Sequence, residues 1–514
     1  MFSLQKKLPF FLLMLLGLSC SEKINRQIEF ANYHPVHPDD SEEVIIQKAA
    51  HIVPTPRQLR WQELELTGFF HFGINTYTGK EWGNGKEDPA LFNPTDLDVE
   101  QWVLTAKQGG IKQVILTAKH HDGFCLWPTA TTTHSVESSP WKAGKGDVVK
   151  EVAEACEKYD MGFGVYLSPW DMNAPMYGTD EYNDFFVAQL TELLTRYGKV
   201  DEVWFDGANG EGPNGKKQEY DFDRWYSLIR ELQPEAVIAI MGPDVRWVGT
   251  ETGYGKETEW SVVPVNNLSQ DQIAESSQKD VNIKPTWDKS DEVLGARGSL
   301  LDAKGLVWYP AETDVSIRPG WFFHESQNNQ VKSVEKLLDI YFHSVGKNGV
   351  LLLNIPPDKS GRVHPTDSLN LLEWKSKIDR IFSENIAKSG KVHPSDGTDA
   401  SNLIDGNQQT FWTPKNKSSI AELVLEFTKP KLFNVLNLQE YIQRGQRVEE
   451  FVLEVELEGD WKEIVNGTTI GYKRLLKFPE VEAKKIRLRI LSSRLNPQLS
   501  EIGLYYDESI NSIR

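Results

Sequence analysis

The sequence predicts an α/β protein in which a (β/α)8-like barrel is followed by an all-β sandwich domain. From about residue 61 to residue 356, short apolar segments alternate with amphipathic helical segments, which is typical of repeated βα units around a parallel sheet. This region of roughly 300 residues fits a barrel better than a doubly wound sheet, and no GxGxxG motif follows a predicted strand. After residue 389, apolar residues tend to recur at every second position, as in antiparallel strands.

Length and charge limit the classes of function. A chain of 514 residues is too long for one ordinary core, so at least two domains are expected. The formal net charge is −18 and no large basic cluster is present, which excludes nucleic acid as a predicted partner. Aromatic residues make up 11% of the chain. They suit stacking on sugar rings, but large barrels and sandwiches also need bulky core residues, so both interpretations stay open.

The N-terminus has the pattern of an export signal. Lys6 and Lys7 precede an apolar stretch over 8–18 that is too short for a membrane span. The segment then ends in Leu-Gly-Leu-Ser-Cys, which resembles a bacterial lipoprotein cleavage site, although Gly17 stands where an aliphatic residue is commoner. We therefore expect a lipoprotein-type signal peptide over 1–20 and a tether over 21–45. The protein would be exported and lipid-anchored at Cys20, in the periplasm or at the cell surface. An ordinary secretory signal with an incidental cysteine is the alternative.

Two further cysteines, Cys125 and Cys156, allow two interpretations. They would pair in an oxidising compartment, or they are separate buried thiols. No CxxC motif or clustered Cys/His spacing is present, so no metal site is predicted in the barrel.

The barrel is predicted over 46–388, with its elements in a regular order. Apolar strands are expected at 67–75, 113–120, 162–168, 202–206, 236–242, 307–312 and 349–356. Helical spacing is found after the N-cap candidate Asp98 and at 148–159, 186–197, 222–232, 333–345 and 369–382. The stretch 243–304 is polar and irregular, so we expect some barrel helices to be missing there.

The sandwich domain is predicted over 389–514. Strands with a period of two are expected at 423–427, 435–438, 451–457, 473–478 and 485–491, with turns between them.

Polar side chains stand where the predicted barrel strands end. Asp206 directly follows Val-Trp-Phe, and a carboxylate at the carboxyl end of a buried barrel strand is typical of a catalytic group. An isolated aspartate there would more often cap the next helix or turn. The neighbouring strands, however, end in His71, in His120 and His121, and in Tyr166.

These residue types suit recognition of a polyol. His120 and His121 are adjacent at a strand end, so we expect their side chains to point to opposite faces, which disfavours a shared metal ion. Imidazoles and carboxylates hydrogen-bond hydroxyls, and indoles cover the apolar face of a sugar ring. Glycoside hydrolysis needs a second carboxylate, and the loop 246–260 offers Glu251, Glu257 and Glu259.

Three motifs within residues 54–357 carry a family resemblance. Trp-Phe-Asp-Gly at 204–207, His-His-Asp-Gly-Phe at 120–124 and His-Phe-Gly at 71–73 resemble the α-L-fucosidases of glycoside hydrolase family 29. The resemblance implies a retaining mechanism with Asp206 as nucleophile. Loop 246–260 is similar to the branch that prefers α-1,3/1,4-linked fucose, which implies Glu251 as general acid/base, with Glu257 and Glu259 as alternatives. The implied fucose-contacting residues are His71, Glu81, Trp82, His120, His121, Tyr166 and Trp321.

The C-terminal region carries a second resemblance. Leu-Ile-Asp-Gly at 403–406, Thr-Phe-Trp at 410–412 and Ser-Glu-Ile-Gly-Leu-Tyr at 500–505 are similar to discoidin-like modules of the coagulation factor 5/8 type C family. Members often hold a structural calcium ion, for which Asp405 is the candidate ligand. Whether this module binds sugar stays open.

These patterns together predict an exo-α-L-fucosidase that acts on fucosylated oligosaccharides or glycoproteins and needs no cofactor for catalysis. One alternative is a glycan-binding surface protein without catalysis, but the loss of Asp206 or of all three loop glutamates would mark that class, and none is lost. The other alternative is a retaining exo-glycosidase of different sugar specificity.

Overall fold

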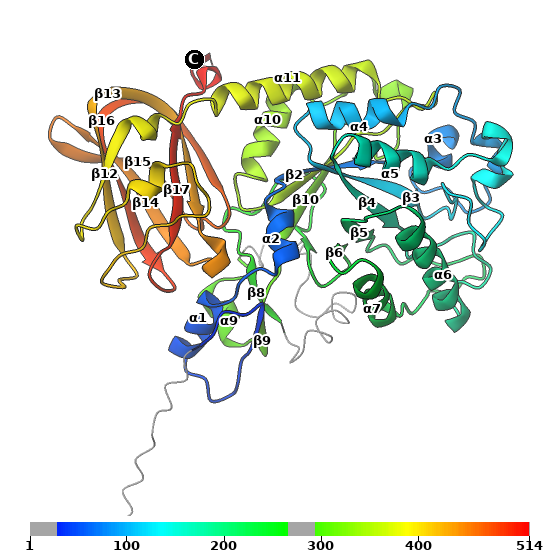
Figure 1. Ribbon diagram of the computed structural model, residues 1–514, viewed down its shortest axis with the longest axis horizontal. Helices are drawn as coiled ribbons and strands as arrows, with labels where there is room; N and C mark the ends of the chain where they lie inside the picture. The colour runs from blue at the N-terminus through cyan, green and yellow to red at the C-terminus, as the bar shows by residue number, and fades with distance from the viewer. Residues whose placement is uncertain (1–27, 266–292, 513–514) are drawn as a thin grey trace, which may run out of the picture.

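The computed structural model describes residues 28–265 and 293–512. They form a barrel, a small three-stranded unit and an antiparallel β-domain (Figure 1). The barrel and the β-domain lie side by side, and helix α11 (Pro365–Ile381) extends from one toward the other. The predicted signal peptide over 1–20, with Cys20, lies outside the described residues. Within the described ranges, no helix has the length and apolar character needed to cross a membrane.

Eight parallel strands form the barrel. Hydrogen bonds join them in the order β6-β5-β4-β3-β2-β11-β10-β7, and the end strands β6 and β7 lie close enough to nearly close the circle. The strands are β2 (Leu66–Phe70), β3 (Gln113–Lys119), β4 (Gly162–Leu167), β5 (Glu202–Phe205), β6 (Val237–Ile240), β7 (Arg246–Trp247), β10 (Ala311–Ser316) and β11 (Val350–Asn354). Nearly all of their residues are buried, as expected for a parallel sheet covered by helices. The barrel prediction is confirmed.

Helices surround the barrel, and polar caps fix where several of them begin. The helices are α3 (Ile74–Thr78), α4 (Val99–Gln108), α5 (Val148–Lys158), α6 (Asp180–Arg196), α7 (Phe222–Leu232) and α10 (Val334–His343), with α2 (Pro56–Gln62) before the first strand. Asp98, Asp147, Asp221 and Ser333 each accept the backbone N–H three residues on, which satisfies a donor that the helix leaves unpaired. The predicted N-cap at Asp98 is confirmed.

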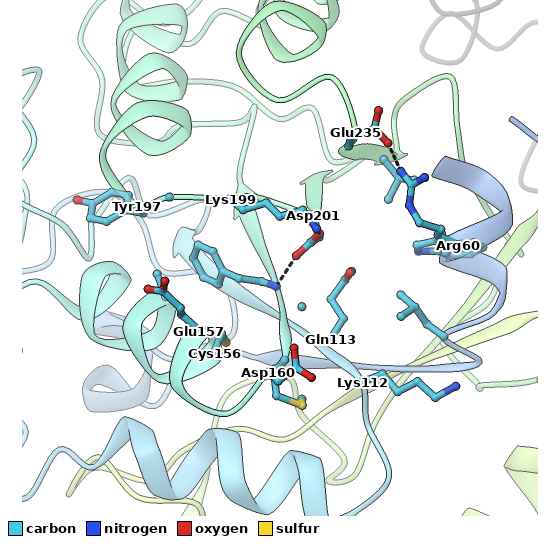
Figure 2. Close-up of a pocket in the computed structure, with 18 of the residues that line it drawn as sticks. Arg60, Lys112, Gln113, Cys156, Glu157, Asp160, Tyr197, Lys199, Asp201 and Glu235 are labelled. Carbon is cyan, nitrogen blue, oxygen red and sulfur yellow. Dashed lines mark hydrogen bonds and ion pairs between the residues drawn. The ribbon is translucent and has the colours of Figure 1, made fainter. Parts of the chain in front are cut away.

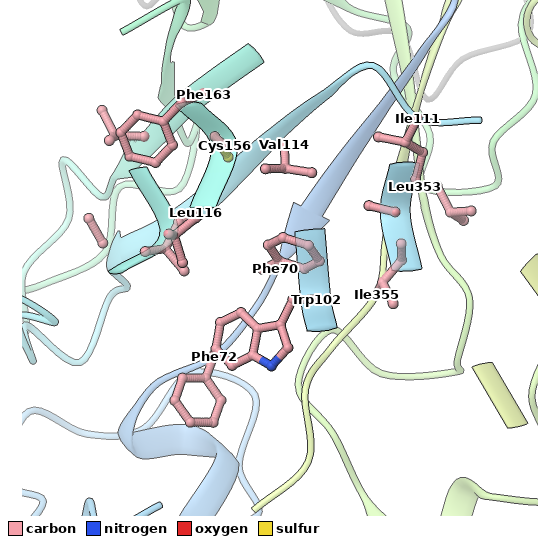
Figure 3. Packing of buried hydrophobic residues seen from close by; sticks show 14 of the residues in the cluster. Phe70, Phe72, Trp102, Ile111, Val114, Leu116, Cys156, Phe163, Leu353 and Ile355 are labelled. Atoms are coloured by element: carbon pink, nitrogen blue, oxygen red, sulfur yellow. The ribbon is translucent and has the colours of Figure 1, made fainter. Parts of the chain in front are cut away.

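Trp102 of α4 shows how a helix is fastened to the barrel (Figure 3). Its ring packs against Phe70 and Phe72, with centroid separations of 5.5 and 5.0 Å. The buried indole N–H donates to the carbonyl of Gly361 at 2.8 Å. The side chain therefore buries a large apolar area without leaving its one polar atom unpaired.

The two barrel cysteines are free and buried. Cys156 belongs to α5 and packs in the main apolar cluster (Figure 3), and burial raises the pKa of its thiol to about 12. Burial also raises the pKa of the Cys125 thiol well above its usual value. The interpretation of Cys125 and Cys156 as separate buried thiols is therefore confirmed, and the interpretation as a disulfide is wrong.

A three-stranded antiparallel sheet stands where barrel helices are missing. It has the order β1-β9-β8, with β1 (Tyr33–Pro35), β8 (Val262–Val265) and β9 (Gly305–Trp308), and lies beside α1 (Glu42–Ala50) and α9 (Arg297–Leu301). No helix lies between β6 and β7. The single strand predicted over 307–312 is wrong, because the chain leaves this sheet at Trp308 and enters the barrel at Ala311. Pro310, which has no N–H for a ladder, lies between the two strands.

The tether predicted over 21–45 is wrong from Tyr33 onward. Tyr33 pairs with Val307 in the small sheet. Val36 and Ile45 are buried, and Ser41 caps α1 by accepting the N–H of Val44. A three-residue strand is too short to show a period, so composition alone gave no sign of this fold.

The C-terminal β-domain is built on two long strands that bend. Its strands are β12 (Gly390–Pro394), β13 (Ala421–Glu440), β14 (Val448–Leu457), β15 (Asp460–Gly467), β16 (Arg474–Ser493) and β17 (Leu499–Tyr505). The pairing of β13 with β16 is interrupted between Glu426 and Lys431. The first half of β13 lies beside β12, while its second half pairs with β17. Side chains of both halves share one core, so the two layers of the predicted sandwich are confirmed. The strands predicted separately are halves of β13 and β16.

The β-domain also fastens the chain segment that follows β7. Arg474 forms an ion pair with Glu257. The N–H of Glu259 donates to Thr469 Oγ1 at 3.1 Å, and Gln446 Nε2 donates to the carbonyl of Glu259 at 3.0 Å. A loop of the barrel is thus held in part by the second domain.

Candidate active site

A cavity of about 490 Å³ lies at the carboxyl ends of the barrel strands. In a barrel this end carries the functional groups, because all eight strands deliver their following loops to it. Every predicted site residue except Glu81 lines the cavity: His71, Trp82, His120, His121, Tyr166, Asp206, Glu251 and Trp321. Strand ends distant in sequence are thus brought together as predicted.

Asp206 directly follows β5 and is held from two sides. Tyr166 donates its hydroxyl to Oδ2 at 3.1 Å, and the N–H of Ala208 donates to Oδ1 at 2.7 Å. The side chain is 27% exposed, with His121 Nε2 3.9 Å from Oδ2. The carboxylate is therefore fixed in direction while it remains open to the cavity.

His71 and His121 are neutral, and each uses one ring nitrogen for the protein. His71 Nδ1 donates to Asn354 Oδ1 at 2.8 Å, because the amide nitrogen of Asn354 is used toward Ser316 and Trp321. His121 Nδ1 donates to Ser168 Oγ at 2.7 Å. Burial lowers the pKa of His71 to about 3 and also lowers the pKa of His121. Each Nε2 is therefore a lone-pair acceptor suited to a hydroxyl.

The expectation that His120 and His121 point to opposite faces is wrong. Both line the cavity, and their ring centroids are 4.2 Å apart. Strand β3 ends at Lys119, so the alternation of a pleated strand no longer applies to the two histidines. Within the described ranges, no group of His, Cys, Asp or Glu is arranged to hold a metal ion.

Stacked rings form one wall of the cavity. Tyr166 stacks on His120 with a centroid separation of 5.5 Å and on Trp204 at 5.2 Å. Trp204 in turn donates its indole N–H to the buried Glu312 at 2.8 Å. Tyr166, which holds Asp206, is therefore itself held by packing from both sides.

The three candidate glutamates of loop 246–260 have different surroundings. Glu251 lines the cavity. Partial burial raises the pKa of its carboxyl, and the charges of Asp206 and Glu81 raise it further. Glu257 instead pairs with Arg474 and Lys347, and Glu259 pairs with Arg246 in the interior. The structure thus brings Glu251 to Asp206 and leaves the other two outside the cavity.

Glu81 differs from its predicted position. Its Oε2 accepts the N–H groups of Trp321 and Phe322 at 2.8 and 3.3 Å, and its Oε1 lies 2.7 Å from His324 Nε2. The carboxylate therefore holds the loop that presents Trp321 and does not itself line the cavity.

Sequence reasoning missed Asp314, which lines the cavity from β10. Its carboxyl accepts the indole N–H of Trp247 at 2.7 Å. The predicted strand stopped at Glu312, two residues too early. Had it been extended, the spacing Glu312-x-Asp314 would have indicated two acids on the same inward face.

A second cavity, of about 700 Å³, lies at the opposite end of the barrel (Figure 2). Its charged side chains are largely paired with one another or with the backbone. Arg60 bonds Glu235, and Asp201 accepts the N–H of Phe163 at 3.1 Å (Figure 2). This end of a barrel serves stability, and the carboxylates of this cavity are not gathered around one point.

The cavity at the carboxyl ends of the strands combines the groups that hydrolysis of a sugar acetal requires. It offers one fixed carboxylate, one carboxyl with a raised pKa, neutral imidazoles for hydroxyls and indole rings for an apolar sugar face. Two carboxyl groups with different environments can divide the roles of nucleophile or base and of acid.

Comparisons with known proteins agree with this chemistry. A family model described as alpha-L-fucosidase matches residues 55–375, and a model described as F5/8 type C domain matches residues 385–502. Alpha-L-fucosidase 1 of Arabidopsis thaliana is 44% identical, over 90% of this chain and 89% of its own. The crystal structure of a Bacteroides ovatus protein assigned as an alpha-L-fucosidase has a TM-score of 0.83 and 51% identity, covering 94% of this chain and 79% of that chain.

A third relative has been crystallised with a sugar. A GH29 fucosidase of Ruminococcus gnavus in complex with fucose has a TM-score of 0.78 and is 32% identical, over 88% of this chain and 95% of its own. The chain therefore belongs to the alpha-L-fucosidase family of glycoside hydrolases, with an F5/8 type C domain as its C-terminal β-domain.

Proposed function

We propose that this fucosidase is a retaining exo-enzyme in which Asp206 is the nucleophile and Glu251 the general acid/base. The observation that carries the proposal is that these two carboxyl groups share one cavity at the carboxyl ends of the strands, while Glu257 and Glu259 are paired elsewhere. Retention needs two carboxyls on opposite sides of the scissile bond and close together. Burial and the charge of Asp206 raise the pKa of Glu251, as the role of a general acid requires.

In the first step, an Asp206 oxygen attacks the anomeric carbon. The bond to the leaving oxygen breaks, its electron pair goes to that oxygen, and Glu251 supplies the proton. In the second step, Glu251 takes a proton from water, the water oxygen bonds to the anomeric carbon, and the Asp206 carboxylate is released. Tyr166 and the Ala208 N–H hold Asp206 in one direction, which favours in-line attack.

The fucose itself would be held by the neutral histidines and the indoles. Nε2 of His71 and of His121 would accept sugar hydroxyls, while Trp321 and Trp82 would cover an apolar ring face. Trp82 is more than half exposed, so a bound sugar would bury apolar area there.

We propose further that the enzyme prefers fucose linked α-1,3 or α-1,4 to a branched N-acetylglucosamine. Support comes from the loop that carries Glu251 and from the apolar side chains of Trp247 and Met241, which line the cavity. Such surface suits the second sugar of a branch, which a linear disaccharide does not present.

The linkage proposal predicts a ratio of rates. The value of kcat/KM for an α-1,3- or α-1,4-fucosylated branched trisaccharide should exceed that for α-1,2-fucosyl galactose by about 10-fold or more. Released fucose, measured for both substrates with one enzyme preparation, gives the ratio. A 4-nitrophenyl fucoside serves as the common reference. Faster turnover of the α-1,2 disaccharide would reject the linkage preference and leave the fucosidase activity untouched.

A structural calcium ion in the β-domain is a separate proposal, supported by the oxygen atoms that gather near Asp405. Thr410 Oγ1 lies 2.8 Å from Asp405 Oδ2 and 2.9 Å from the carbonyl oxygen of Asn407. Glu501 approaches the same turn through the N–H of Gly406 at 3.2 Å. Carboxylate, hydroxyl and carbonyl oxygens are the ligands that Ca²⁺ prefers.

Metal removal tests this proposal. With EDTA, the Tm of the wild type should fall by about 5 °C and recover with added Ca²⁺, because an ion that binds only the folded state stabilises it. Asp405→Asn should abolish the response, and Asp399→Asn, in the same loop region, should keep it. The ammonium of Lys388, 3.4 Å from the Asp405 carbonyl, is the rival cation. A wild-type Tm that changes with neither EDTA nor Ca²⁺ would favour Lys388 as the cation at this place and would reject the calcium ion.

A further inference from the structure

Asp314 is an acid in the catalytic cavity to which the mechanism above gives no role. It lies on β10 inside the barrel and is buried, yet it lines the same cavity as Asp206 and Glu251. A carboxyl group is rarely buried unless it is paired or functional. Among the residues that the structure describes, no lysine, arginine or histidine pairs with it.

Asp314 fastens the loop that carries Glu251 at two points. Its side-chain Oδ1 accepts the indole N–H of Trp247 at 2.7 Å, and its backbone carbonyl accepts the N–H of Gly253 at 3.0 Å. Glu251 lies between these two points. A single residue of β10 therefore holds the chain on both sides of Glu251.

The charges around Asp314 come from several elements. Burial raises the pKa of its carboxyl to about 7, and the charges of Glu251 and Asp206 contribute to the rise, while the hydrogen bond from Trp247 opposes it. Glu312, on the same strand, accepts the indole N–H of Trp204, and burial raises the pKa of its carboxyl well above the usual value.

The remaining charged neighbours are engaged with other groups. Arg246, on the adjacent β7, is directed to Glu259 and to the carbonyl of Tyr309. Glu81, whose charge reaches Glu251, is held by His324 and by the Trp321 loop. The side chain of Asp314 is therefore bonded to Trp247 and not to either of these groups.

We propose that Asp314 is a positioning residue of the hydrolytic site, whose two hydrogen bonds, to Trp247 and to Gly253, hold the loop that carries Glu251. The inference rests on the proposed role of Glu251. A general acid must stay within reach of the leaving oxygen, so a loop held on both sides of Glu251 favours proton transfer.

Asp314→Leu removes the side-chain acceptor, while Asp314→Asn keeps one, because an amide oxygen can still accept the Trp247 N–H. The value of kcat/KM for a fucosylated trisaccharide should fall on the order of 10²-fold in Asp314→Leu and be largely restored in Asp314→Asn. For an aryl fucoside with a good leaving group, which needs little protonation, kcat/KM should change less than about 3-fold in both variants. Asp339→Asn is the matched control. Asp339 bonds Tyr254 of the same loop from outside the cavity, so its removal should leave kcat/KM for the trisaccharide unchanged.

Trp247→Phe removes the same hydrogen bond from the donor side, and the double variant Asp314→Leu/Trp247→Phe should lose little more activity than Trp247→Phe alone, because both changes break one contact. Since Trp247 also lines the cavity, the double variant separates loss of this bond from loss of a sugar contact. Circular dichroism and Tm confirm folding of each variant.

Two outcomes distinguish this inference from the function on which it rests. Wild-type turnover of the trisaccharide by Asp314→Leu, in an enzyme whose Glu251→Ala variant shows acid/base loss, would overturn the role of Asp314 alone. A wild-type-like Glu251→Ala variant would instead overturn the acid/base assignment. Equal losses in Asp314→Leu and Asp339→Asn would also overturn the inference, because they would reflect a general change of the loop.

Discussion

Replacing Asp206 with glycine should lower turnover of every fucoside, natural or activated, on the order of 10⁴- to 10⁶-fold, as loss of a nucleophile does in other hydrolases. Asp206 directly follows β5, and its two oxygens are held by the Tyr166 hydroxyl and the Ala208 N–H. No neighbouring carboxyl can replace it in this position. Glu251 lies on the side proposed for the leaving group, and Asp314 is held against Trp247.

Azide should partly restore turnover of an aryl α-fucoside by the Asp206→Gly variant. The small anion would enter the space of the missing carboxylate and attack the anomeric carbon from the same side, so the product should be β-fucosyl azide. NMR of the product gives its anomeric configuration. Asp184→Asn is the control and should behave like the wild type, because it changes an exposed carboxylate of α6 that pairs with Arg224 of α7. Near-normal turnover by Asp206→Gly without azide would remove the nucleophile assignment.

The barrel was predictable because buried parallel strands are short apolar runs between helical segments. Strands 113–120 and 162–168 were expected within a residue of their observed ends at Lys119 and Leu167. The small sheet was not predictable, because Tyr33–Pro35 is a strand only through its pairing with a segment more than 270 residues away. Short strands depend on tertiary pairing more than on local pattern.

Strand geometry alone predicts the site residues that end strands, whereas the roles of the loop residues Trp82, Glu251 and Trp321 were predicted only from the family resemblance. Asp206 and Tyr166 were found because barrel geometry alone brings strand ends to one rim. The predicted orientation of His120 was wrong, because the alternation of side chains along β3 ends with the strand at Lys119. Glu81 was misplaced for a different reason, since its carboxylate bonds backbone N–H groups of a loop some 240 residues later. No sequence pattern encodes such a pairing.

Glu251→Ala should affect substrates according to their leaving group. Turnover of a fucosylated trisaccharide should fall about 10²- to 10⁴-fold, since general acid catalysis contributes that range. The first step on a fucoside with a good aryl leaving group should be nearly unchanged, because such a group departs without a proton. The contrast arises because the carboxyl of Glu251, with a pKa raised by burial and by the charges of Asp206 and Glu81, is the proton source.

The pH dependence of kcat/KM gives a second test of this role. A raised pKa keeps Glu251 protonated above the usual range of a glutamate, so in the wild type kcat/KM for the trisaccharide should fall only as pH rises through that raised value. The Glu251→Ala variant has no such proton to lose. Its turnover of the aryl fucoside should therefore be nearly independent of pH on the alkaline side.

Azide should rescue the second step of Glu251→Ala, because it attacks the β-linked intermediate on Asp206 without general base help. A second inversion then gives α-fucosyl azide, the opposite anomer from the one that Asp206→Gly forms. Glu257→Ala and Glu259→Ala are matched controls on the same loop, and their side chains pair with Arg474 and Arg246 away from the cavity. Rescue by azide in either control, with wild-type behaviour of Glu251→Ala, would move the acid/base assignment to that residue. The same anomer from both the Asp206 and the Glu251 variants would contradict double displacement itself, since only a covalent intermediate makes the two products differ.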